Sequence, residues 1–181
     1  MRRFLVTGAS GAGKTAVARQ LRAWGHLAIS ADGDRRLSGW EDAHGARVPR
    51  PREPDAAWLA EHRWMWSQQR LEEILADAGR DGARTVWVCG RADNALLLAD
   101  RFTAVFLLEV DQRTMAQRIR ERRGGNDFGR VGDTLADALA GYHAFVAAWR
   151  RFGAYPVDAT RDIRDVGEEL LLSAAAIALR R

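Results

Sequence analysis

Lysine, cysteine and long apolar runs are scarce in this chain of 181 residues. Of its 28 basic residues 27 are arginine, and Lys14 is the single lysine. The single cysteine, Cys89, excludes an internal disulfide, which is typical of the reducing cytoplasm. No run of 18 apolar residues is present, so we expect no membrane span. We interpret the short apolar run near the start as a first strand rather than a signal peptide.

The net charge of +4 raises the question of a nucleic acid partner. The arginines are spread over the whole chain and form no stripe, so we do not expect such a partner. Many alanines accompany the arginines, which indicates a coding bias that replaces surface lysines by arginine. Arginine cannot easily replace a compact ammonium group among phosphates. Because Lys14 alone stays a lysine, we expect the segment around it to need a compact ammonium group.

Short apolar runs alternate with helical patterns along the chain. The runs are apolar throughout, which predicts parallel strands that are buried on both faces. We expect strands at 3–6, 26–30, 84–89, 104–110 and 154–158. We expect helices at 15–24, 56–78, 92–100, 112–123, 134–152 and 163–179. This order predicts one three-layer α/β domain over residues 1–181, with a sheet of about five parallel strands.

Two segments do not fit this scheme. Residues 35–55 are polar and carry three of the four prolines, and residues 122–133 are rich in glycine and arginine. Both segments are too long for simple turns, which indicates functional loops.

The first predicted strand leads into "GASGAGKT", which matches the phosphate-loop pattern G-x-x-x-x-G-K-[ST] in full. Backbone N–H groups of such a loop surround phosphates, the lysine bridges the terminal phosphates, and the threonine hydroxyl binds Mg²⁺. The predicted nucleotide-binding residues are therefore Gly8, Ala9, Ser10, Gly11, Ala12, Gly13, Lys14 and Thr15. Guanine recognition usually needs a second lysine, which the chain lacks, so we expect ATP with Mg²⁺.

The second predicted strand runs into "ISADGDRR", and here the chain resembles the small P-loop kinases: shikimate, gluconate, adenylylsulfate and nucleoside monophosphate kinases. The resemblance implies the P-loop NTPase fold and transfer of the γ-phosphoryl group of ATP to a hydroxyl of a small molecule. A carboxylate at this place can orient or deprotonate the hydroxyl and hold Mg²⁺ through water, and we assign Asp32 to both roles. Asp34 either binds the acceptor or caps an Asp-Gly turn.

The third predicted strand ends in Cys89-Gly90-Arg91, where many P-loop ATPases have an acidic Mg²⁺ ligand. Its absence disfavours a mechanical ATPase. The glycine turn resembles shikimate kinase, in which this place meets the acceptor. The resemblance implies that Gly90 lets the backbone approach a ligand and that Arg91 pairs with an anionic group; the alternative for Arg91 is a surface arginine. We interpret Cys89 as a small buried hydrophobic residue.

An arginine-rich helix and loop follow the fourth predicted strand, in "DQRTMAQRIRERRGGNDFGR". In the families named above, this place holds a mobile lid whose arginines stabilise the charge of the transferring phosphoryl group. The lid is expected at about 120–133. Its candidates are Arg118, Arg122 and Arg123 for phosphate, Gly124 and Gly125 for the hinge, and Arg130 for the tip; Arg118 and Arg122 are the two assigned to catalysis. The alternative is a solvated helix face.

The last predicted strand leads into a loop that packs on adenine in nucleotide kinases of this type. Thr160 and Arg161, after Ala159, lie at that place, although an ordinary turn is equally compatible. The acceptor-binding segment is expected at about 35–75, with Arg35 and Trp66 among its ligands. Trp58 and Trp64 belong to the same tryptophan-rich stretch, which is either core or acceptor wall. Trp40, His44 and Arg47 would add to a pocket for a ring-bearing acceptor that can carry negative charge.

The resemblance covers nearly the whole chain in element order, but the acceptor segment departs from every family named. We expect a small-molecule kinase. A nucleoside or nucleotide kinase is the alternative, and a monophosphate acceptor would need arginines such as Arg35, Arg36, Arg70 and Arg91. A polynucleotide kinase and a non-catalytic ATP-binding module are further alternatives.

Overall fold

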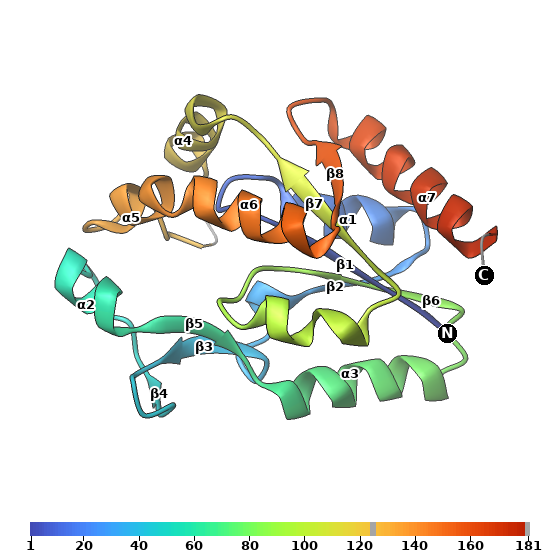
Figure 1. Cartoon of the computed structure of the whole chain (residues 1–181), viewed down its shortest axis with the longest axis horizontal. Helices are drawn as coiled ribbons and strands as arrows, with labels where there is room; N and C mark the ends of the chain where they lie inside the picture. Colours follow the sequence, from blue (N-terminus) through green and yellow to red (C-terminus); the bar gives the residue numbers. More distant parts are fainter. Residues whose placement is uncertain (124–125, 180–181) are drawn as a thin grey trace.

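A computed structural model of the chain describes residues 1–123 and 126–179; the expected hinge residues Gly124 and Gly125 lie outside this part. A five-stranded parallel sheet forms the centre, in the order β2-β6-β1-β7-β8 (Figure 1). Its strands are β1 (Arg2–Gly8), β2 (Leu27–Ser30), β6 (Thr85–Cys89), β7 (Ala104–Glu109) and β8 (Tyr155–Asp158). The predicted P-loop fold class, with five parallel strands between layers of helices, is confirmed.

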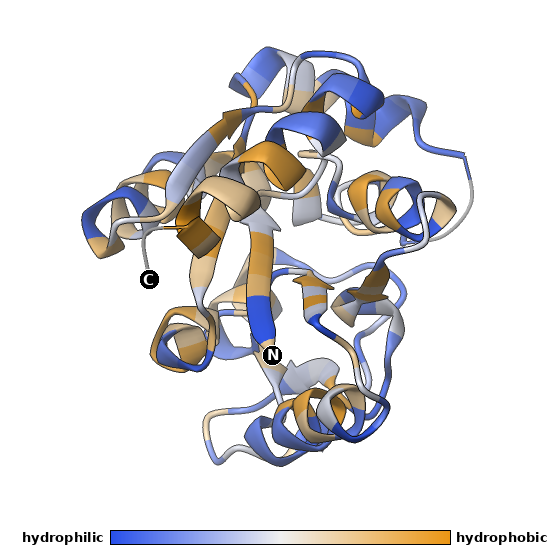
Figure 2. Cartoon of the chain, turned by 90° about the vertical axis from the view of Figure 1, so that its right-hand side faces the viewer, coloured by the Kyte–Doolittle hydropathy of each residue, from blue (hydrophilic) through white to orange (hydrophobic). Residues whose placement is uncertain are grey.

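The strands are apolar throughout because both faces of the sheet are covered. Along β1, Phe4 and Val6 face one apolar cluster and Leu5 faces the other. On the first face pack α1 (Lys14–Ala23) and α7 (Ile163–Leu179), and on the second pack α3 (Gln68–Arg80) and the 3₁₀ helix η2 (Ala95–Arg101). Figure 2 shows hydrophobic strands at the centre and hydrophilic outer faces on the helices. Each fully buried large apolar side chain contributes about 1.5–3 kcal/mol to this packing.

The lid region continues from α4 (Gln112–Glu121) into α5 (Thr134–Ala140) and α6 (Tyr142–Phe152). The single helix predicted over 134–152 is therefore two helices. Gly141 separates them: its N–H still donates to the carbonyl of Asp137, and its own carbonyl already serves the next helix. Glycine stabilises a helix interior poorly, which explains the break.

The long helix predicted over 56–78 is also wrong. The structure has a short helix, α2 (Ala56–Glu61), then strand β5 (Arg63–Trp66), and only then α3. Strand β5 pairs antiparallel with β3 (Ser38–Glu41), which pairs in turn with β4 (Arg47–Val48). This small second sheet, absent from the sequence prediction, supports the acceptor segment (Figure 1).

Local capping explains why the chain leaves the helical conformation between α2 and α3. The side chain of Asp55 caps α2 by accepting from the N–H of Trp58 at 2.8 Å, and Ser67 caps α3 by accepting from the N–H of Arg70 at 3.2 Å. Trp66 lies between these two caps, and the side chain of Asn94 binds both of its backbone groups. The N–H of Trp66 donates to the side-chain oxygen of Asn94 at 3.0 Å, and its carbonyl accepts from the side-chain amide at 2.9 Å. These side-chain bonds hold the segment as a strand beside the carboxyl end of β6.

Across residues 1–123 and 126–179, no helix is long and apolar enough to span a bilayer.

Candidate functional site

The phosphate loop joins β1 to the amino end of α1. Gly11 (φ 80°) and Gly13 (φ 101°) adopt the left-handed conformation, which favours glycine. Gly8 has a different constraint, because a Cβ there would lie 2.8 Å from the carbonyl oxygen of Leu108 in β7. No side chain caps α1 at Gly13, so the first-turn N–H groups stay available to an anion. The loop thus has the backbone that its motif predicts.

Lys14 is folded back into this loop. Its Nζ donates to the carbonyls of Gly8 at 2.8 Å and Ala9 at 2.9 Å, and the side chain is buried. Burial lowers the pKa of Lys14 to about 8, with the nearby carboxylate of Asp32 acting in the opposite direction and the charge of Arg91 adding to the lowering. The lysine is therefore mostly protonated at neutral pH and loses its proton near pH 8, and a bound polyphosphate would raise this pKa.

Asp32 lies in the 3₁₀ turn η1 (Ala31–Gly33) after β2, on the wall of the same cavity as Lys14. Its Oδ1 accepts from the backbone N–H of Arg91 at 3.2 Å. A Cβ on Gly90 would lie 3.1 Å from that oxygen and 2.6 Å from the Cβ of Ala31. Gly90 is not among the residues that line the cavity, and its lack of a side chain makes room for Asp32. A contact between Gly90 and the acceptor stays a prediction.

Asp34 and Trp66 do not line the cavity either. The Oδ1 of Asp34 accepts from the N–H groups of Arg36 at 2.8 Å and Leu37 at 3.1 Å, and its Oδ2 pairs with Arg70 at 3.2 Å. Trp66 is 2% exposed and packs in the core behind Gly90. In this structure Asp34 caps the turn and Trp66 packs in the core, and their assignment to the acceptor stays a prediction.

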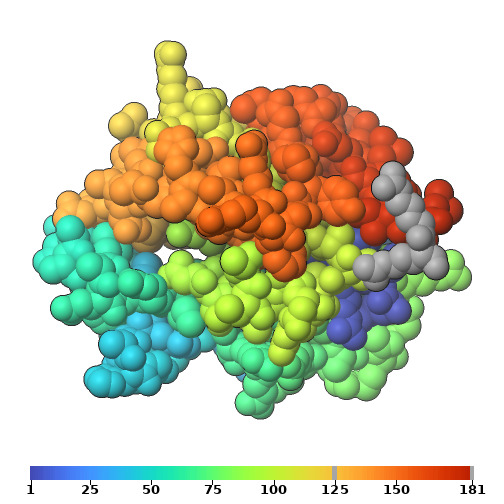
Figure 3. All heavy atoms as spheres, viewed as in Figure 1, coloured from blue at the N-terminus to red at the C-terminus, as the bar shows by residue number. Residues whose placement is uncertain are grey.

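A cavity of about 1550 Å³ joins the phosphate loop to the acceptor segment and the lid. In Figure 3 a hollow is visible between the turquoise atoms of α2 and the orange atoms of α5 and α6. Ligand cavities usually measure about 300–1000 Å³, so this one has room for two ligands side by side. Ser10, Gly11, Gly13, Lys14 and Thr15 line its phosphate-loop end.

Basic side chains on the cavity wall include the predicted Arg35, Arg118, Arg122 and Arg123, and also Arg19, which was not predicted. Arg118 also donates to the carbonyl of Ala159 at 2.8 Å, which ties the lid helix to the loop after β8. Burial lowers the pKa of Arg122, and the charge of Arg130 lowers it further. Arg130 is exposed and donates to the carbonyl of Arg122 at 2.9 Å, so it braces the lid from outside the cavity.

Thr160 and Arg161 stand beside this end but do not line the cavity. The hydroxyl of Thr160 donates to Asp158 at 2.6 Å, and the guanidinium of Arg161 pairs with Glu169. Their side chains are thus engaged within the turn, and contact with adenine through their backbone stays a prediction.

The acceptor end of the cavity has an aromatic wall. The ring of Trp40 lies 5.6 Å from Trp64 and 5.9 Å from Phe128 of the lid. The polar residues here include four that no sequence pattern selects: Arg50, Arg63, Asp93 and Asp137. They come from four separate segments, and no local motif marks any of them.

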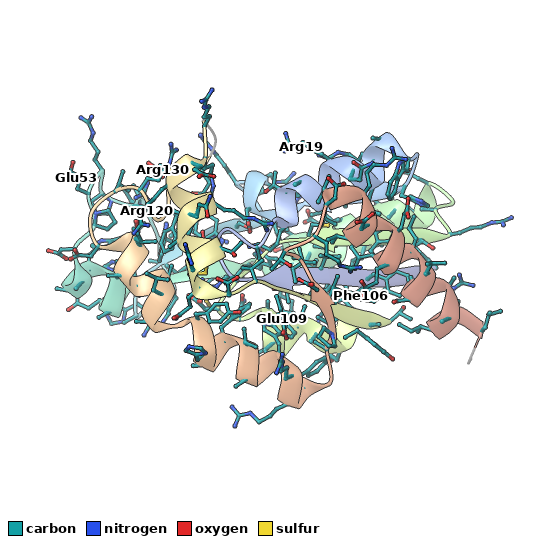
Figure 4. The ribbon with its side chains drawn as sticks, turned by 90° about the horizontal axis from the view of Figure 1, so that it is seen from above. Arg19, Glu53, Phe106, Glu109, Arg120 and Arg130 are labelled. Atoms are coloured by element: carbon teal, nitrogen blue, oxygen red, sulfur yellow. The ribbon has the colours of Figure 1, made fainter. Side chains whose placement is uncertain are left out.

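The acceptor segment and the lid touch above the cavity. Arg50 pairs with Asp127 at 2.6 Å, and the carboxylate of Asp133 accepts from the N–H of Ala56 at 2.9 Å. The N–H of Asp133 donates to the carbonyl of Pro54 at 2.9 Å. Seen from above, Glu53 of the acceptor segment lies on the same side of the molecule as Arg120 and Arg130 of the lid (Figure 4).

Two oxygen donors on the cavity wall suit Mg²⁺: the hydroxyl of Thr15 and the carboxylate of Asp32. Both belong to the set predicted for the metal. Among the described residues, no group of three or more His, Cys, Asp or Glu side chains is placed to hold a metal ion. The donors that are present fit an ion that is held largely by phosphates and water.

No family model and no curated protein matches the chain in sequence. Solved structures do match it over nearly its whole length. A gluconokinase from Sinorhizobium meliloti 1021 is 19% identical with a TM-score of 0.55, covering 99% of this chain and 94% of that one. A shikimate kinase from Acinetobacter baumannii in complex with shikimate is 17% identical with a TM-score of 0.54, covering 97% and 94%.

A deoxyadenosine kinase from M. mycoides with bound dATP is 13% identical with a TM-score of 0.51, covering 96% of this chain and 99% of that one. At these identities the likeness concerns the fold. The predicted resemblance is confirmed at that level: the chain has the fold of the P-loop kinases.

Proposed function

We propose that this protein transfers the γ-phosphoryl group of ATP to a hydroxyl group of a small molecule. The observation that carries the proposal is the position of Asp32 on the wall of the cavity that also holds Lys14 and Thr15. The N–H of Arg91 fixes one oxygen of this carboxylate and leaves the other for a ligand. The residues that would bind the phosphates of ATP and the carboxylate that would take the hydroxyl proton thus line the same cavity.

In the proposed reaction, Lys14 leaves the loop carbonyls and contacts the terminal phosphates of ATP. The acceptor oxygen forms a bond to the γ-phosphorus as the bond to the bridging oxygen of ADP breaks, and Asp32 takes the hydroxyl proton. Arg118 and Arg122, which line the cavity from the lid side, stabilise charge on the transferring group. Mg²⁺ held by Thr15 and Asp32 would neutralise phosphate charge.

A nucleoside monophosphate acceptor is less well supported. Of the arginines that such an acceptor would need, Arg36 and Arg70 pair with Glu73 and do not line the cavity. Arg91 faces Asp93 at 3.7 Å. A nucleoside remains the second candidate, because the aromatic wall of Trp40 and Trp64 suits a flat ring.

A screen of ATP consumption over sugars, amino sugars, nucleosides, nucleotides and antibiotic-like alcohols tests the proposal. An acceptor should raise ADP release, and the phosphorylated product should be found by mass spectrometry. Lys14→Ala should abolish turnover with the fold intact, as judged by circular dichroism. A non-catalytic ATP-binding module predicts nucleotide binding with no acceptor-dependent turnover in the wild-type protein.

A further inference from the structure

Three arginines on the cavity wall, Arg50, Arg63 and Arg91, already have partners within the protein. Arg50 pairs with Asp127 at 2.6 Å. Arg63 donates to the carbonyls of Ala60 at 2.9 Å and His62 at 3.0 Å at the end of α2. The guanidinium of Arg91 lies 5.1 Å from the centre of the Phe145 ring. An anionic acceptor would compete with these contacts for each cation.

The carboxylates at this end, in contrast, have unused capacity to accept hydrogen bonds. Asp93 accepts from the N–H of Trp64 at 2.9 Å through one oxygen, and its other oxygen is 3.7 Å from Arg91, beyond hydrogen-bond distance. Within the described residues, the carboxylate of Asp137 accepts no hydrogen bond. Burial raises the pKa of Asp137, the nearby charges of Arg91 and Arg63 act against this, and that of Asp93 adds to it.

The aromatic wall favours the same kind of ligand. Indole rings carry negative charge on their faces and attract cations as well as flat rings. Trp40 and Trp64 line the cavity together with Asp93 and Asp137. An ammonium group or a set of hydroxyls would find a hydrogen-bond acceptor and an aromatic face together, whereas a carboxylate or phosphate would meet two like charges.

From this balance we infer that the acceptor is a ring-bearing alcohol, neutral or cationic, whose hydroxyl or amino groups donate to Asp93 and Asp137. The inference rests on the proposed function and specifies the substrate class of that site. The sequence analysis left room for an acceptor that carries negative charge. We disfavour it because Arg50, Arg63 and Arg91 already have partners within the protein. Asp93 and Asp137 determine specificity, and Asp32 remains the base.

The test compares acceptors that differ only in charge: glucosamine, glucose and gluconate as one set, and adenosine with adenosine monophosphate as another. Binding is measured calorimetrically in the presence of a non-hydrolysable ATP analogue, and turnover by ADP release. The expected result is binding or turnover of neutral or amine-bearing members, with the acid and the phosphate rejected by at least about tenfold, which is about 1.4 kcal/mol.

Asp137→Asn should raise the KM for the preferred acceptor about tenfold and leave the KM for ATP unchanged. Asp165→Asn is the matched control, because Asp165 also lies in the first turn of a helix but does not line the cavity. It should change neither constant. Asp137→Arg should shift preference toward the acid.

Three outcomes would overturn the inference: preference for gluconate or the monophosphate, an unchanged acceptor KM in Asp137→Asn, or no binding by any neutral or cationic member. Preference for an acid together with Lys14-dependent turnover would overturn only the substrate class. Failure of Lys14→Ala to affect ATP binding or turnover would instead count against the proposed function itself.

Discussion

Arg50 of the acceptor segment pairs with Asp127 of the lid, with 2.6 Å between the guanidinium nitrogen and the carboxylate oxygen. The two residues are 77 positions apart in the sequence, and Arg50 also lines the cavity. Arg50 is 17% exposed and Asp127 is 47% exposed, so the two halves of the pair have different access to water. This asymmetry makes a stability prediction possible.

Removing Asp127 should cost more stability than removing Arg50. Asp127→Ala leaves a largely buried guanidinium without its partner, at a cost of about 1–3 kcal/mol in the free energy of unfolding. Arg50→Met keeps the apolar stem and leaves a carboxylate that water can solvate, at a cost of about 1 kcal/mol or less. Urea unfolding of both variants and of the double variant measures this order. A larger loss in Arg50→Met would contradict the account.

Nucleotide binding should take up a proton at alkaline pH. The pKa of Lys14 is lowered by burial to about 8 in the free protein, so above that pH the side chain is mostly neutral. Phosphates beside Nζ favour the charged form and raise this pKa, so binding at pH 9 should take up close to one proton per site, and binding at pH 7 close to none. Calorimetry in buffers of different ionisation enthalpy measures the uptake.

The control for this measurement is Lys14→Met, whose side chain carries no proton at either pH. Its residual binding, measured at raised nucleotide concentration, should show no added uptake at pH 9. Equal proton uptake by the wild-type protein at pH 7 and pH 9 would be inconsistent with a buried Lys14 that titrates near 8.

Gly90→Ala should lower turnover through displacement of Asp32. The new methyl group would lie 2.6 Å from the Cβ of Ala31, 2.8 Å from the Trp66 ring and 3.1 Å from the Asp32 carboxylate. Crowding of this kind in a packed region typically costs about 1–3 kcal/mol. Gly33→Ala is the matched control. Gly33 lies in the turn that carries Asp32, and a Cβ there meets only Ser30, at 4.0 Å. The midpoint temperature of thermal unfolding and kcat should both fall in Gly90→Ala. Both should stay near the wild-type values in Gly33→Ala.

The thiol of Cys89 should be inert in the folded protein. Burial raises its pKa to about 12, and the side chain is 1% exposed at the end of β6. Maleimide labelling, followed by mass spectrometry, should give no adduct under native conditions and full labelling in denaturant. Rapid native labelling would show that the phosphate-loop side of the sheet opens more readily than its packing implies.

The sequence was a good guide wherever a local rule decides the conformation. The glycines of the phosphate loop, the parallel sheet and the position of Asp32 after β2 follow from short-range patterns. The helix predicted over 56–78 failed because Trp58, His62 and Met65 recur at helical spacing. The alternation of Trp64 and Trp66, which fits a strand, was given too little weight. The segment is a strand because it pairs with β3, and no local sequence pattern predicts that pairing.

The acceptor end of the site was largely beyond prediction for the same reason. Phe128, Asp93 and Asp137 come from the lid, the turn after β6 and helix α5, and only tertiary packing brings them to one cavity. In a chain with 27 arginines, the sequence also could not tell which arginines are already paired. Arg50 and Arg70 look alike in the sequence, yet one lines the cavity and the other does not.

The central claim is that Asp32 serves as the base for an acceptor hydroxyl in a cavity that also binds ATP. The most direct measurement is ATP binding and acceptor phosphorylation by Asp32→Asn, whose amide oxygen can still accept from the N–H of Arg91. The account predicts a fall in kcat of about 100-fold to 10,000-fold with ATP affinity nearly unchanged. Phosphorylation at the wild-type rate by this variant would contradict it.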